Sequence, residues 1–178
     1  MRFQETPLHG AFIVEPEKLE DERGFFARSW CANEFRQHGL SASLAQCNIS
    51  SNRRRGTLRG MHYQKPPHGE IKLVRCTMGS IFDVIIDLRP ASSTYARWFG
   101  VELSASNHRM LYIPEDFAHG FLTLCDNSEI FYQMSTPFVA GAGEGCRWND
   151  PAFSIDWPGE IAVISEKDRS YPDFDRNR

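Results

Sequence analysis

Residues 57–88 read TLRGMHYQKPPHGEIKLVRCTMGSIFDVIIDL and contain two apolar runs and a third, shorter one, joined by turns rich in proline and glycine. Alternate residues of a β-strand point to the same face of a sheet. On this alternation, His62, Lys72 and Asp83 fall on faces with apolar neighbours. An imidazole, an ammonium and a carboxylate at inward positions are costly unless paired, so the stretch predicts a polar cavity. The alternative is that both faces of these strands are covered and each polar group is satisfied individually.

Short apolar runs recur along the rest of the chain, with turn residues between them. Residues 19–24 predict a charged turn, 139–145 a loop and 165–178 a polar tail. One helix is expected at residues 33–38, with Asn33 as its N-cap and Gly39 just beyond its end. Many short strands and one clear helix predict an all-β jelly roll, and the chain reads as a single domain, residues 1–178. Further strands are expected at residues 12–15, 24–30, 43–51, 98–104, 110–113, 120–124, 129–135 and 161–165.

Composition and charge argue against several classes of protein. A chain of 178 residues suits one well-packed domain, and a net charge of -3 gives no indication of a nucleic-acid or membrane partner. The sequence has no run of 18 apolar residues, and its first ten residues, MRFQETPLHG, lack the apolar segment of a signal peptide. The five cysteines are widely spaced and form no CxxC pair, which predicts reduced thiols in the cytoplasm.

A metal site is the first chemistry to consider. His62, Gln64, Glu70 and His119 loosely resemble the two-segment ligand pattern of metal-binding cupins. That pattern has His-x-His in its first segment, whereas this chain has an amide at position 64, which is a poor ligand for a transition metal. We therefore expect no functional metal, with a metal cupin such as a dioxygenase as the alternative.

Proton transfer is the second possibility. His62 has a side chain that titrates near neutral pH, and Tyr132, Asp83 and Asp168 are available as partners. A histidine base and a tyrosine acid on opposite sides of a substrate suit removal and return of a proton next to a carbonyl. Lys72 could stabilise the enolate oxygen that develops. Tyr132 shares its face with apolar residues, so the alternative is an ordinary core aromatic.

Two further chemistries have weaker signals. Arg23, Arg59 and His119 lie in separate segments and could converge on a diphosphate, although surface ion pairs are the usual role of an isolated arginine. The sequence contains no glycine-rich phosphate loop. It also has no GxSxG motif and no cysteine with a nearby histidine that would indicate nucleophilic catalysis.

Several long motifs cover nearly the whole chain: DERGFFARSW (21–30), LRGMHYQ (58–64), KLVRC and GSIFDVIIDLR (within 72–89), GVELSASNHRMLYIPEDFAHGF (100–121), RWNDPAFSIDWP (147–158) and SEKD (165–168). In sequence and order they resemble the motifs of the dTDP-4-dehydrorhamnose 3,5-epimerase family. The resemblance implies a double-stranded β-helix of the cupin class that works as a homodimer without a metal or a redox cofactor. It also implies a dTDP-linked 4-keto-6-deoxyhexose as substrate, with inversion at C3 and C5 on the way to dTDP-L-rhamnose.

Residue by residue, the resemblance implies a catalytic set and a binding set. His62 would be the general base, Asp168 would orient it, and Tyr132 would be the acid on the opposite face of the sugar. Lys72 would hold the C4 oxygen, and Asp83 would lie in the same pocket. The residues implied in substrate binding are Arg23, Gln46, Asn48, Arg59, Lys72, His119, Phe138, Glu144 and Lys167.

Four positions depart from the family pattern. Arg28 stands where many members have a glutamate, Phe138 where a tyrosine usually stacks on thymine, and Asp116 where a glycine is usual. Residues 140–145, AGAGEG, replace a more charged segment. All four lie on the nucleotide side or in a loop, so the nucleotide and sugar are less firmly implied than the proton chemistry. The alternatives are a C3-only epimerase and a non-catalytic sugar-binding cupin; the RGMHYQ and SEKD motifs argue against a 3,4-ketoisomerase.

Overall fold

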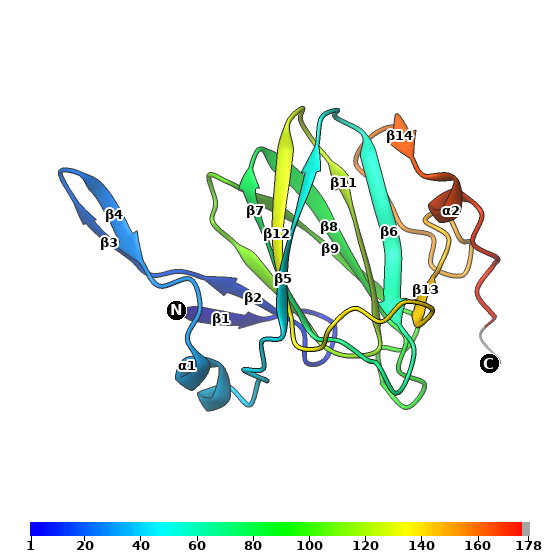
Figure 1. Ribbon diagram of the computed structural model, residues 1–178, viewed down its shortest axis with the longest axis horizontal. Coiled ribbons are helices and arrows are strands. Elements are labelled where there is room, and N and C mark those ends of the chain that lie inside the picture. The colour runs from blue at the N-terminus through cyan, green and yellow to red at the C-terminus, as the bar shows by residue number, and fades with distance from the viewer. Residues whose placement is uncertain (176–178) are drawn as a thin grey trace.

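The computed structural model describes residues 1–175 and consists mainly of two facing antiparallel sheets (Figure 1). This arrangement confirms the predicted all-β, cupin-like jelly roll. The first sheet runs in the order β1 (Arg2–Glu5), β2 (Phe12–Glu15), β10 (Met110–Ile113), β7 (Lys72–Met78), β12 (Ser128–Met134) and β5 (Gln46–Asn52). The second runs β13 (Gly143–Gly145), β6 (Thr57–Gln64), β11 (Phe117–Thr123), β8 (Ser80–Asp87) and β9 (Trp98–Ser104), and β14 (Val163–Ile164) pairs in parallel with β6.

The main core lies between the two sheets and is built by alternate residues of the central strands. Val74 on β7 and Ile81 and Ile85 on β8 belong to this interior cluster. Lys72 and Asp83 follow the same alternation and are buried with them. The prediction that polar groups point inward on β7 and β8 is therefore confirmed.

The outer faces of both sheets are also covered in part. Phe35 of helix α1 (Ala32–Gln37) packs with Leu73 and Tyr112 on the outside of the first sheet. Phe153 packs with Met61 on the outside of the second sheet. Covering on both faces was the alternative to a polar cavity, and the structure contains both features. In the described part of the chain, neither helix has the length and apolar character needed to cross a bilayer.

A two-stranded hairpin extends away from the sheets, on the side of the molecule opposite helix α2 (Figure 1). It consists of β3 (Lys18–Asp21) and β4 (Gly24–Ala27), so the turn expected at residues 19–24 is only two residues long. The prediction of a longer turn was wrong. All side chains of β3 are exposed, so the polar composition of this segment did not distinguish a strand from a turn. Phe26, in β4, is 73% exposed.

Three other sequence expectations need correction. Cys31, and not Asn33, is the N-cap of helix α1. Asn33 lies inside the helix, where its side chain accepts a hydrogen bond from Arg36 at 3.2 Å. Gly39 does follow the helix with a left-handed φ of +71°. The expected polar tail contains helix α2 (Glu166–Arg169), capped by the Ser165 side chain; residues 176–178 lie outside the described part. Strands β1 and β13 were not predicted.

Candidate active site

A cavity of about 520 Å³ opens between β5, β12 and β7 of the first sheet and β6 and β13 of the second. Polar and aromatic side chains from both sheets and from the segment around α2 line it. Its lining includes eight of the predicted site residues: Gln46, Asn48, His62, Lys72, Tyr132, Phe138, Glu144 and Lys167. Elements distant in sequence therefore bring most of the predicted site together.

His62, on β6, is held by a carboxylate from α2. Its Nε2 lies 2.7 Å from Oδ1 of Asp168, and the other oxygen of Asp168 accepts the Gly60 N–H at 3.2 Å. Gly60 has a φ of +125°, and a Cβ there would collide with the backbone of Gly120, so only glycine fits this close approach of β6 and β11. The His62 side chain remains 42% exposed toward the cavity. One ring nitrogen is thus bonded to Asp168 and the other is open to a substrate.

Burial of Asp168 acts to raise the pKa of its carboxyl group. The hydrogen bond and charge of His62, together with bonds from Gly60 and Ser165, outweigh this effect, so the pKa is lowered. Asp168 is therefore ionised at neutral pH and accepts a hydrogen bond from the Nε2–H of His62. A carboxylate in this position fixes the tautomer and orientation of an imidazole base.

Lys72 lies on β7 with its ammonium inside the cavity. Its Nζ is 2.8 Å from Oε1 of Glu70, and it donates to the backbone oxygen of His62 at 3.3 Å. The two side chains are only 8% and 6% exposed, so the pair is shielded from water. An ammonium has three N–H donors, and these two bonds leave one of them for a ligand oxygen.

Tyr132 enters the cavity from β12, on the sheet that faces His62. Burial raises the pKa of its hydroxyl group; Glu70 adds to the rise, and the charge of Arg59 opposes it. The phenol therefore carries its proton at neutral pH. Its ring also packs against the interior core. The imidazole, the ammonium and the phenol thus line one cavity.

Three predicted residues lie deeper in the barrel or beside the cavity. Asp83 and His119 form a buried pair, with His119 Nε2 2.8 Å from Asp83 Oδ1. Arg59 donates from Nε to Asn52 at 2.8 Å, and its charge acts on the Tyr132 phenol. None of the three predicted residues is part of the cavity lining.

Arg23 lies far from this cavity within the chain. It occupies the turn between β3 and β4, in the projecting hairpin of Figure 1. Its side chain is 84% exposed and paired with Asp21. Its predicted contact with a substrate would require a second copy of the chain.

The mouth of the cavity carries side chains suited to an extended ligand. Phe138 is 62% exposed there, and Oε1 of Gln46 accepts its backbone N–H at 2.8 Å. Glu144, on β13, pairs with Lys65 at 3.2 Å. An exposed ring beside amide and charged groups fits the flat base and phosphates of a nucleotide.

Six residues of the cavity lining were not among the predicted site residues: Tyr63, Gln64, Glu70, Met134, Gly143 and Tyr171. Gln64 is committed to the backbone, since its Nε2 donates to the backbone oxygens of His68 and Pro137 and its Oε1 accepts from Val139. Within residues 1–175, no three His, Cys, Asp or Glu side chains are grouped as a metal site would require. Glu70 and Tyr171 had no local sequence signal, because their positions depend on how distant elements pack.

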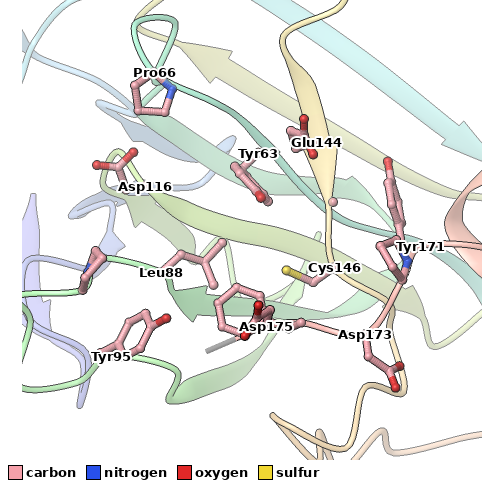
Figure 2. Close-up of a pocket in the computed structure, with 14 residues that line it drawn as sticks. Tyr63, Pro66, Leu88, Tyr95, Asp116, Glu144, Cys146, Tyr171, Asp173 and Asp175 are labelled. Atoms are coloured by element: carbon pink, nitrogen blue, oxygen red, sulfur yellow. The ribbon is translucent and has the colours of Figure 1, made fainter. Parts of the chain in front are cut away.

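A second cavity, of about 470 Å³, lies against β13 and the C-terminal segment (Figure 2). It shares three lining residues with the first: Tyr63, Glu144 and Tyr171. Figure 2 shows Tyr171 alongside β13, with its hydroxyl directed away from Asp173 and Asp175. Tyr171 thus stands at the boundary between the two cavities.

Comparisons with known proteins point to one family. The family model for dTDP-4-dehydrorhamnose 3,5-epimerase matches residues 5–176. A dTDP-4-dehydrorhamnose 3,5-epimerase of Methanothermobacter thermautotrophicus is 44% identical over 99% of this chain and 96% of its own.

Two crystal structures described as this enzyme are similar over almost the whole chain. The one from Elizabethkingia anophelis has a TM-score of 0.95 at 38% identity and covers 98% of this chain and 96% of its own. The one from Bacillus anthracis, solved with TDP and PPi bound, has a TM-score of 0.94 at 39% identity, covering 97% and 99%.

Proposed function

Since the chain belongs to the dTDP-4-dehydrorhamnose 3,5-epimerase family, we propose that it inverts C3 and C5 of dTDP-4-dehydro-6-deoxy-D-glucose, in dTDP-L-rhamnose biosynthesis. One observation carries the proposal: His62 and Tyr132 reach the same cavity from opposite sheets, with the Lys72 ammonium in the same lining. An epimerase needs a base and an acid on opposite faces of the carbon that it inverts.

The first step is proton abstraction by His62. The C4 ketone acidifies the hydrogens on both C3 and C5, because either carbanion is delocalised into an enolate. The Nε2–H of His62 donates a hydrogen bond to Asp168, so the lone pair on Nδ1 is free to take the proton. The electron pair of the broken C–H bond moves to the C4 oxygen, and Asp168 stabilises the imidazolium that forms.

Lys72 stabilises the charge that develops on the C4 oxygen. Glu70 and the His62 carbonyl occupy two of its donors, so the third can meet the enolate oxygen. Because the pair is buried, the donor is preorganised and little water competes for it.

Tyr132 completes the inversion by returning a proton on the opposite face. Its raised pKa keeps the hydroxyl protonated until the enolate requires a proton. His62 then loses the proton it gained and Tyr132 regains one, through exchange with solvent. Because loss and return of a proton leave the oxidation state of each carbon unchanged, the reaction needs no redox cofactor.

The remaining predicted residues would bind and surround the nucleotide sugar. Phe138 can stack on the base at the mouth of the cavity. Asp83 and His119 support the cavity from inside the barrel. Amide and charged groups of the lining would contact the nucleotide sugar: Gln46, Asn48, Glu144 and Lys167. Arg59 would contact it from beside the cavity.

We further propose that the chain is a single domain that forms a homodimer in the cytoplasm. The hairpin carries Phe26 and Leu19 in exposed positions, which a second copy of the chain would cover. In such a dimer, Arg23 of one copy would reach the cavity of the other. The five free cysteines are consistent with a reducing compartment. Light scattering tests the dimer, which would have twice the chain mass of 20.4 kDa.

Proton NMR of dTDP-4-dehydro-6-deoxy-D-glucose in heavy water tests the function. We expect deuterium at both C3 and C5 when the protein is added, because each carbon loses a proton to His62 and receives another from the solvent pool. Deuterium at C3 alone would assign the chain as a C3 epimerase. No exchange at either carbon, with a folded protein, would overturn the substrate assignment.

A further inference from the structure

Tyr171 contacts the catalytic histidine from outside the predicted site. It follows α2, three residues after Asp168, and lines both the active-site cavity and the cavity beside it. Its ring lies 6.2 Å from that of His62, measured between centroids, at an interplanar angle of 69°. This is the edge-to-face arrangement that aromatic pairs favour, and it restricts the tilt of the smaller ring.

The backbone of β13 provides the surface on which Tyr171 rests. Gly145 is directly opposite His62 in the antiparallel ladder of β13 and β6. A Cβ at position 145 would collide with the Tyr171 ring. The absence of a side chain at Gly145 therefore allows the Tyr171 ring to lie beside the His62 strand.

The ring of Tyr171, and not its hydroxyl, carries this contact. In the described part of the chain, the hydroxyl is buried and makes no hydrogen bond of ordinary geometry. Burial raises the pKa of Tyr171, although the charge of nearby Lys167 acts to lower it, so the hydroxyl is neutral at physiological pH. The contact with His62 is therefore made by the two rings alone.

We propose that Tyr171 is a positioning residue that fixes the plane of the His62 ring and closes the wall of the active-site cavity behind it. Asp168 fixes one nitrogen of the imidazole and Tyr171 fixes the tilt of the ring, so that the other nitrogen keeps its direction toward the substrate carbons. Both constraints come from one short C-terminal segment, residues 165–171. The proposal rests on the proposed role of His62 as the base.

The first test compares Tyr171→Leu with Tyr171→Phe in steady-state epimerisation. Leucine fills part of the space without the aromatic edge, and we expect kcat to fall about tenfold with little change in KM, because substrate contacts remain. Phenylalanine keeps the ring and should stay within about twofold of the wild type. A similar loss of kcat in both variants would overturn the positioning role and assign the effect to the hydroxyl. A rise in KM with unchanged kcat in Tyr171→Leu would also overturn it, because the residue would then act in substrate binding.

The second test does not depend on turnover. Nitrogen-15 NMR of the labelled protein reports the tautomer and the exchange broadening of the His62 ring. We expect one sharp Nε2–H tautomer in the wild type and in Tyr171→Phe, and a broadened or mixed signal in Tyr171→Leu and in Gly145→Ala. A His62 signal unchanged in both of these variants, with their folds intact, would refute the proposal even if the protein is an active epimerase.

Failure of the two proposals can be told apart. If the wild-type protein exchanges no substrate hydrogens but its His62 signal still responds to Tyr171→Leu, the proposed reaction fails and the contact stands. If the wild-type protein exchanges C3 and C5 and the His62 signal does not respond, the reaction stands and Tyr171 has no positioning role.

Discussion

The structure contains two histidine–aspartate pairs of almost the same length in very different surroundings. His62 lies 2.7 Å from Asp168, and His119 lies 2.8 Å from Asp83. The two histidines face each other across the ladder of β6 and β11. The side chain of His62 is 42% exposed toward the cavity, whereas that of His119 is 11% exposed. The same pair of groups is therefore open to a substrate in one place and sealed within the barrel in the other.

The difference indicates that access, rather than the pairing itself, separates the two roles. An open imidazole with one nitrogen fixed by a carboxylate can act as a base. A sealed pair mainly satisfies two buried polar groups and holds neighbouring strands together, because breaking it leaves a charge unpaired in the interior. Mutations at the two pairs should thus separate activity from stability.

The largest effect is expected from His62→Ala. Loss of the base should reduce turnover by about 10³-fold, the range usual for general acid–base groups. Stability should change less than at the sealed pair, because the Asp168 carboxylate keeps its hydrogen bonds from Gly60 and Ser165. Steady-state epimerisation and urea unfolding measure the two effects. Much of the affinity for the nucleotide sugar should remain. If turnover remained within about tenfold of the wild type, another group would have to be the base.

The next effect is expected at the sealed pair, in Asp83→Ala. Removing the carboxylate leaves His119 without its partner, and we expect the free energy of unfolding to fall by about 3 kcal/mol. Urea denaturation at neutral pH measures this change, with His62→Ala as the matched control at the open pair. A cost below about 1 kcal/mol, with turnover reduced as in His62→Ala, would place Asp83 in the catalytic step and remove the distinction.

A third buried carboxylate, whose partner is an arginine, sharpens the comparison through its pH dependence. Burial acts to raise the pKa of Asp87, but hydrogen bonds from Arg89, Ser92 and Thr94 outweigh it and lower the pKa from 3.8 to about 2. Because folding lowers this pKa, the ionised carboxylate stabilises the fold at any pH above its ordinary pKa of 3.8. This stability is lost as the pH falls from about 4 to about 2.

This network gives the smallest expected change, in Asp87→Asn. The shift corresponds to about 2 kcal/mol of stability near neutral pH. The difference in unfolding free energy between wild type and Asp87→Asn should shrink as the pH falls from about 6 to about 2, when measured by urea unfolding. A difference that stays constant over this range would show that the hydrogen bonds of Asp87 do not depend on its charge.

The alternation of residues within strands predicted much of the barrel. Period-two spacing placed Lys72 and Asp83 inside, and the bounds expected for β2, β9 and β10 agree with the structure. Elements held by few neighbours were harder to predict. The free hairpin had the composition of a turn, and α2 is a four-residue helix whose start depends on one bond from Ser165.

The partners within the site could not be derived from local pattern. Asp168 is 106 residues from His62 in sequence, and His119 is 36 residues from Asp83. Family resemblance supplied the role of Asp168. Glu70 was considered only as a metal ligand, and Tyr171 was given no role, because each acquires its contact only when the strands and the C-terminal segment pack.

The separation of His62 from Asp168 also has a consequence during synthesis on the ribosome. Translation proceeds at roughly 5–20 residues per second, so about 5–20 seconds pass between the addition of the two residues. Throughout that interval the nascent chain carries an imidazole on β6 that has no carboxylate to orient it. The active site is therefore assembled last, when the segment carrying α2 leaves the exit tunnel and docks beside strands that were made earlier.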